Sequence, residues 1–90
     1  MRETELLSSR HIKTILYIYD VGGEIYGYIE LSKKLHMGPH TMKHVLLTLE
    51  LTGILDRTVG PNNIHIYRLT EKGRRIAEKL KEVMEILSES

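Results

Sequence analysis

The stretch from residue 31 to residue 49 combines basic side chains with a complete lack of carboxylates. It holds three lysines and three histidines, whereas the whole chain of 90 residues has a net charge of only +1. Ammonium and protonated imidazole groups attract phosphate oxygens, and an acid-free stretch leaves them available to a polyanion. The stretch therefore predicts a surface that binds something negative. Its basic residues are Lys33, Lys34, His36, His40, Lys43 and His44.

The histidines allow a second chemistry, because imidazole nitrogens also bind zinc. His40 and His44 are four residues apart and would share one face of a helix, whereas His36 precedes that helix. The chain has no cysteine, and the histidine cluster contains no acidic ligand. We therefore expect no metal ion and no other cofactor, with a zinc site as the alternative that a zinc titration tests.

Several classes of function find no support in the sequence. The serines stand in no nucleophile-elbow motif, and the chain has no glycine-rich phosphate loop, so we expect no enzyme activity. No apolar run approaches the ~20 residues that a membrane span needs. The N-terminus is acidic and lacks the apolar core of a signal peptide. We therefore expect a cytoplasmic protein without a membrane partner.

Short helices must position the basic stretch. Apolar residues at three- and four-residue steps predict a first helix over residues 5–20, which a pair of glycines ends. Residues 24–26 have the composition of a very short strand. A second helix is expected over residues 28–35, and its apolar positions are Ile29, Leu31 and Leu35.

The third helix is predicted to run from Pro39 to about Thr52. Gly38 suits the N-cap, and Pro39 suits the first helical position, where its missing N–H has no partner to lose. Gly53 follows at the place where a left-handed cap is needed. The buried stripe is expected to consist of Met42, Val45, Leu46 and Leu49.

A β-hairpin and a long helix complete the chain. Residues 54–59 and 64–69 read as two strands joined by the Gly-Pro-Asn-Asn turn, and Thr70 caps a helix that reaches about Leu87. This order predicts an α+β, mostly helical fold, the winged helix-turn-helix: a three-helix core, a hairpin wing and a long C-terminal helix. We expect one DNA-binding domain over residues 1–90, with residues 71–90 as a dimerisation helix.

The outward side of the third helix carries the candidate recognition chemistry. At 100° per residue, His40, Lys43, His44 and Leu47 fall opposite the buried stripe, and Thr41 and Thr48 lie on one flank. Lysine donates to guanine or phosphate, threonine contacts either, and leucine meets a thymine methyl. Histidines near phosphate favour their protonated form, which predicts stronger binding as the pH falls toward 6.

Two segments resemble known regulators. Residues 35–46 and 49–57, with the run Leu49-Glu50-Leu51-Thr52-Gly53, resemble the recognition segment of the MarR, ArsR and PadR winged-helix families. The run Tyr67-Arg68-Leu69-Thr70-Glu71-Lys72-Gly73 is similar to the element that follows their wing, and also resembles small winged-helix proteins of archaea and archaeal viruses. The chain departs from these families at Gly38, where Ser or Thr is common, and at Lys43 and His44, where Arg or Ser is common.

The resemblance implies a sequence-specific regulator of transcription, specifically a repressor, that binds double-stranded DNA. Helix 39–52 would lie in the major groove, and wing 54–69 would lie on the backbone or in the minor groove. For Asn62 and Asn63 the alternative is a role in turn geometry alone, and for the lysines ordinary solvation. The expected DNA contacts are Lys33, Lys34, Pro39, His40, Thr41, Lys43, His44, Leu47, Thr48, Arg57, Asn62, Asn63 and Arg68.

The last helix predicts a homodimer associated with the nucleoid. Its second half would extend past a domain this small, and a second copy would cover its apolar side, so two recognition helices would lie about 34 Å apart. Leu51 is expected to pack on the hairpin or on a second subunit. The alternatives are a monomer with a frayed C-terminus and a winged-helix module that binds a protein in a transcription or chromatin complex. The expected interface residues are Leu6, Leu7, Leu80, Val83, Met84 and Leu87.

Overall fold

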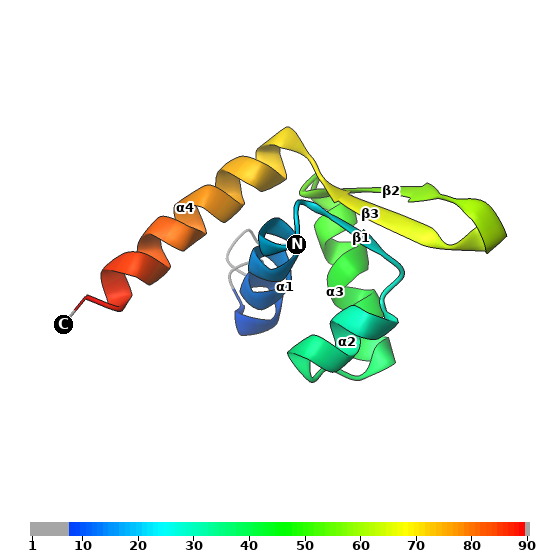
Figure 1. Cartoon of the computed structure of the whole chain (residues 1–90), viewed down its shortest axis with the longest axis horizontal. Helices are drawn as coiled ribbons and strands as arrows, with labels where there is room; N and C mark the ends of the chain where they lie inside the picture. The colour runs from blue at the N-terminus through cyan, green and yellow to red at the C-terminus, as the bar shows by residue number, and fades with distance from the viewer. Residues whose placement is uncertain (1–7, 90) are drawn as a thin grey trace.

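The computed structural model describes residues 8–89. Helices and strands alternate along the chain in the order that the sequence predicts, and the short strand forms as expected (Figure 1). The first helix begins at Ser9, and residues 5–7 of the expected helix lie outside the described residues. The elements are α1 (Ser9–Asp20), β1 (Glu24–Tyr26), α2 (Ile29–Leu35), α3 (Pro39–Leu51), β2 (Leu55–Val59), the 3-10 turn η2 (Pro61–Asn63), β3 (His65–Leu69) and α4 (Glu71–Leu87).

The core is assembled around one side of α3. The predicted stripe is confirmed, because its four members are at most 2% exposed. Ile15 and Ile18 of α1 and Leu31 of α2 pack against it. The prediction for Ile29 is wrong, since this side chain lies on the outer side of α2 and is 67% exposed. The four stripe residues are Met42, Val45, Leu46 and Leu49.

The three strands form one antiparallel sheet in the order β1-β3-β2. Successive side chains in a strand point to opposite faces, and Ile25, Tyr67 and Leu55 are buried on the inner face. The outer face therefore carries their neighbours. There the register sets Arg68 of β3 between Glu24 of β1 and Asp56 of β2.

The hairpin is anchored to the start of α4. The hydroxyl of Thr70 donates to the Gly53 carbonyl at 2.6 Å and accepts from the Gly73 N–H at 3.0 Å, so it caps α4 as predicted. Gly73 lies so close to the hairpin that an added Cβ would stand 2.2 Å from the Ile54 carbonyl oxygen. The run from Thr70 to Gly73 thus fixes the angle at which the wing leaves the core.

α4 extends away from the core on the side opposite the wing (Figure 1). Its first half packs on the core through Ala77, Ile76 and Leu80. Its last two turns expose apolar side chains, with Val83 49% and Leu87 71% exposed. In residues 8–89, no helix combines the length and apolarity that crossing a membrane requires.

Candidate nucleic-acid interface

The outward side of α3 is exposed along its length. His40, Lys43, His44 and Leu47 all lie on the surface, opposite the buried stripe, as the helical spacing predicts. Gly38 has an extended backbone at the N-cap, and Pro39 occupies the start of the helix. Because Gly38 supplies no capping side chain, the first turn of α3 presents its N–H groups outward, where an anion is stabilised by the helix dipole.

The flank of α3 differs from the prediction. Thr48 is only 3% exposed, so the expectation that its side chain lies on the outward flank is wrong. Its backbone oxygen also accepts the Thr52 hydroxyl at 2.9 Å. Thr48 lies next to Val45 and Leu49 on the helix, close enough to the core stripe to be covered with it. Thr41, one turn and a half earlier, is partly exposed and remains on the accessible side.

Two lysines on α2 extend this surface. Lys33 and Lys34 are exposed in the last turn of α2, where lysines complement the helix dipole. Among residues 8–89, neither lysine joins an ion pair, and neither does Lys43. We call Lys33, Lys34 and Lys43 together the lysine face. Its charges are not neutralised by any described carboxylate.

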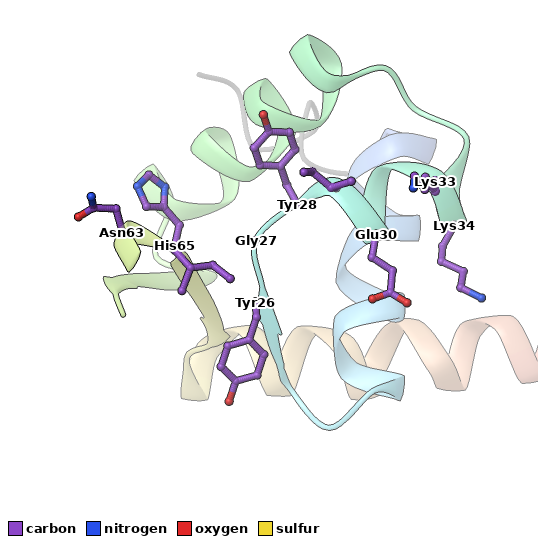
Figure 2. A pocket seen from close by; sticks show the side chains of 10 residues that line it. Tyr26, Gly27, Tyr28, Glu30, Lys33, Lys34, Asn63 and His65 are labelled. Atoms are coloured by element: carbon purple, nitrogen blue, oxygen red, sulfur yellow. The ribbon is translucent and has the colours of Figure 1, made fainter. Parts of the chain in front are cut away.

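A cavity of about 860 Å³ separates α2 from the tip of the wing. Lys33 and Lys34 line its α2 side, and Asn63 and His65 line its wing side (Figure 2). Gly27 lies between them at φ +71, a left-handed conformation that favours glycine. The cavity is therefore an open groove with cations on α2 and polar groups on the wing.

Tyr28 connects this groove to α3. Figure 2 shows its ring between α2 and α3, with the hydroxyl pointing toward α3. The Lys43 ammonium lies over the ring, 5.2 Å from the ring centroid. Sequence reasoning missed Tyr28, because helical spacing within α3 gives no information about which residue before α2 the lysine will meet.

Arg57 is bound to the protein itself. Its Nε donates to both carboxylate oxygens of Glu50 on α3, at 3.2 Å each. The pair ties β2 to α3, and it places a negative charge beside the guanidinium that was expected to hold a phosphate. Arg57 therefore reaches a phosphate only in competition with Glu50.

Arg68 is held more firmly. Its guanidinium donates twice to Glu24, once at 3.0 Å through Nε, and the Tyr26 hydroxyl donates to the same carboxylate at 3.0 Å. The hydrogen bond from Arg68, followed by that from Tyr26, lowers the pKa of Glu24. Arg68 also lies on the outer face of the sheet, away from α3, so we do not retain it as a DNA contact.

The tip of the wing is polar and uncharged. Asn62 and Asn63 both adopt φ +59, which asparagine tolerates better than most residues. This geometry supports the turn role that the sequence left open. Both side chains are exposed, so the turn role does not prevent a contact with a nucleic acid.

His11 of α1 is a second residue that the sequence reasoning missed. Its Nδ1 lies 2.5 Å from the Ser8 hydroxyl, whereas its Nε2 is buried and has no partner among the described residues. Burial lowers the pKa of His11, and the nearby charges of His44 and Arg10 lower it further. His11 is therefore electrostatically coupled to the recognition side of α3.

The histidines do not assemble a metal site in the described structure. His36 caps α2 in a left-handed conformation with φ +54, away from the helical run of His40 and His44. No group of three or more histidines and acids in residues 8–89 is arranged to hold a metal ion.

The expected dimer residues fall into three groups. Leu80 is half-buried against the core of its own chain, so only part of it is available to a partner. Val83, Met84 and Leu87 are exposed on the last turns of α4. Leu6 and Leu7 lie outside the described residues. Leu51 is 73% exposed, so the expectation that it packs on the hairpin is wrong.

Comparison with known proteins identifies the fold. A family model described as HxlR-like helix-turn-helix matches residues 6–90. No curated protein matches the chain. Among solved structures, AF1382 from Archaeoglobus fulgidus shares 20% identity over 99% of this chain and 100% of that chain, with a TM-score of 0.76.

Two regulators of transcription are also similar in structure. FabT from Streptococcus pneumoniae, solved in complex with DNA, is 25% identical over 94% of this chain and 64% of that chain, with a TM-score of 0.72. A MarR family protein from Bacillus stearothermophilus is 23% identical over 94% of this chain and 63% of that chain, with a TM-score of 0.67. The present chain thus spans less than two thirds of these two proteins. The predicted winged-helix fold and the resemblance to MarR-type regulators are confirmed.

Proposed function

The chain belongs to the HxlR-like helix-turn-helix family, and from this premise we propose that it is a sequence-specific DNA-binding repressor of transcription that acts as a homodimer. The observation that carries the proposal is the lysine face. Three exposed cations border one groove and one recognition helix, and no described carboxylate neutralises them. Phosphates of duplex DNA supply the missing negative charge.

The proposed contacts divide into base readers and phosphate holders. Lys43, His40, His44 and Leu47 project from α3 in the manner of a recognition helix that enters the major groove. Lys43 donates to a guanine edge, and Leu47 contacts a thymine methyl. The remaining contacts position the duplex through its backbone. They are Lys33, Lys34, Pro39, Thr41, Asn62, Asn63 and, in competition with Glu50, Arg57.

The end of α4 supports the homodimer. Its exposed apolar side chains form a stripe that a second copy would remove from water, at roughly 25 cal/mol per Å² of apolar area buried. A dimer would set two recognition helices about one DNA turn apart, so the preferred site would be pseudo-palindromic. A protein that acts in this way on the chromosome would work in the cytoplasm, on the nucleoid.

The exposure of two leucines favours a second candidate function. Leu47 is 50% exposed on the outward side of α3, and Leu51 is 73% exposed at its end. Apolar side chains on a recognition helix also suit a protein partner, so the same winged helix would then be an interaction module. Such an interface would depend weakly on salt, whereas phosphate contacts lose affinity steeply.

Selection of duplexes from a random DNA library by the full chain tests the proposal. We expect an enriched pseudo-palindromic motif. The Lys43→Ala variant should bind the enriched duplex weakly, whereas Lys79→Ala, on the exposed side of α4, serves as the matched control and should bind normally. Failure of the wild-type protein to enrich any motif would contradict the proposal.

A further inference from the structure

Tyr28 occupies a fixed position between two helices. It follows Gly27, whose left-handed backbone turns the chain from β1 into α2, and its carbonyl accepts the Ser32 N–H at 2.8 Å. The ring is partly buried against the core. Its backbone and its ring are therefore both held, and the ring offers one face to the surface where Lys43 lies.

Lys43 has the opposite character. It is exposed on α3, and a lysine side chain in water samples many rotamers that must be given up when it binds a ligand. A cation within about 6 Å of a ring centroid is attracted by the ring quadrupole, and 5.2 Å satisfies this condition. An ammonium has three N–H donors, so Lys43 can rest on the ring and still donate to another group.

We propose that Tyr28 is a positioning residue for Lys43, which holds the ammonium on the recognition side of α3 before DNA arrives and so determines specificity at the base pair that Lys43 reads. The proposal rests on the DNA-binding function proposed above. Tyr28 acts by limiting the freedom of the lysine, because a group that is already oriented loses less entropy on binding. It adds to the DNA contacts a residue from the start of α2, which α3 alone does not supply.

A double-mutant cycle tests this role. The variants are Tyr28→Leu, which removes the ring, Tyr28→Phe, which keeps the ring and removes the hydroxyl, Lys43→Met, and the combination of Tyr28→Leu with Lys43→Met. Affinity is measured by fluorescence anisotropy on the selected duplex and on duplexes altered at single positions. Circular dichroism and thermal unfolding establish that each variant is folded.

We expect Tyr28→Leu to weaken binding to the selected duplex by about two- to fivefold, the range of an exposed cation–π contact, and to relax preference at one base pair. Tyr28→Phe should stay within about twofold of the wild type. In the Lys43→Met background, Tyr28→Leu should have almost no effect, because the cation that it positions is gone. An equal loss of affinity with and without Lys43 would overturn the proposal, since it would assign Tyr28 a purely structural role.

A measurement without DNA separates this proposal from the proposed function. In the free protein, the ring should shift the proton resonances of the Lys43 ε-methylene upfield in the wild type and in Tyr28→Phe, and Tyr28→Leu should abolish the shift. Equal shifts in the wild type and Tyr28→Leu would overturn the pairing. A ring-dependent shift in a protein that selects no duplex would instead contradict the DNA-binding function, and with it the role of Tyr28 in specificity.

Discussion

The lysine face and the hairpin carry similar cations in different electrostatic settings. Arg57 and Arg68 on the hairpin each hold a carboxylate, of Glu50 and Glu24 respectively, whereas no described carboxylate pairs with the lysines of α2 and α3. The hairpin arginines therefore stabilise the position of the wing. The lysines, which have no such partner, are available to a ligand.

This comparison shows that the type of a residue does not decide its role. An arginine is the stronger phosphate ligand, because its planar group donates two parallel hydrogen bonds. A neighbouring carboxylate uses the same geometry and must be displaced before a phosphate binds. The difference between the two regions is thus one of competition, and variants can break or sharpen it.

The largest effect is expected from detaching the hairpin. Gly73→Ala places a Cβ 2.2 Å from the Ile54 carbonyl oxygen, so backbone must move, which should lower the free energy of unfolding by about 3 kcal/mol. Thermal unfolding should show a midpoint that falls by roughly 10–20 °C. Gly38→Ser, where an added Cβ has nothing within 4 Å, is the matched control and should unfold near the wild-type temperature. A midpoint unchanged in Gly73→Ala would mean that the wing is not anchored at this contact.

The second effect breaks the lysine face. Lys43→Ala should weaken binding to the selected duplex by about 1–3 kcal/mol and relax preference at one base pair, because it removes a base contact. Competition binding with single-position variants of the duplex measures both quantities. A uniform loss on all duplexes would instead assign Lys43 to a phosphate.

A smaller effect of the opposite sign sharpens the comparison. Glu50→Gln removes the charge that competes for Arg57, so affinity for duplex DNA should rise by about two- to fivefold. Glu82→Gln on α4, which removes an exposed carboxylate far from α3, should leave affinity unchanged. Weaker binding by Glu50→Gln would show that Glu50 instead holds Arg57 in its binding position.

The smallest effect concerns the pH dependence of stability. The pKa of Glu24 is lowered from the ordinary value of 4.5, because Arg68 and Tyr26 donate to its charged form. The folded state therefore gains stability from this carboxylate above pH 4.5, and loses it as the pH falls through the lowered pKa. Thermal midpoints between pH 6 and pH 3 should decline less in Glu24→Gln than in the wild type. Parallel curves would show that the ion pair does not form in solution.

Much of the fold follows from local patterns in the sequence. The stripe of α3 and the cap at Thr70 depend on spacing within one element, and both are confirmed. Ile29 and Thr48 depend on how neighbouring helices approach, so helical angles alone assigned them to the wrong side.

The candidate site could be predicted only in part. The exposed lysines of α2 and α3 are found from an acid-free stretch, because no partner needs to be known. Arg68 meets Glu24 across the register of two strands, 44 residues apart, and Tyr28 meets Lys43 between two helices. Such pairs are set by tertiary packing, and composition carries no signal for them.

The salt dependence of DNA affinity tests most directly whether the lysine face binds phosphates. The dissociation constant for the selected duplex is measured over a range of salt concentrations in the wild type, in Lys33→Ala with Lys34→Ala, and in Arg68→Ala. The slope of log affinity against log salt should become shallower by about 0.9 for each lysine removed per protomer, and should not change in Arg68→Ala. A slope that is unaffected by the lysines, or one that changes with Arg68, would contradict the account.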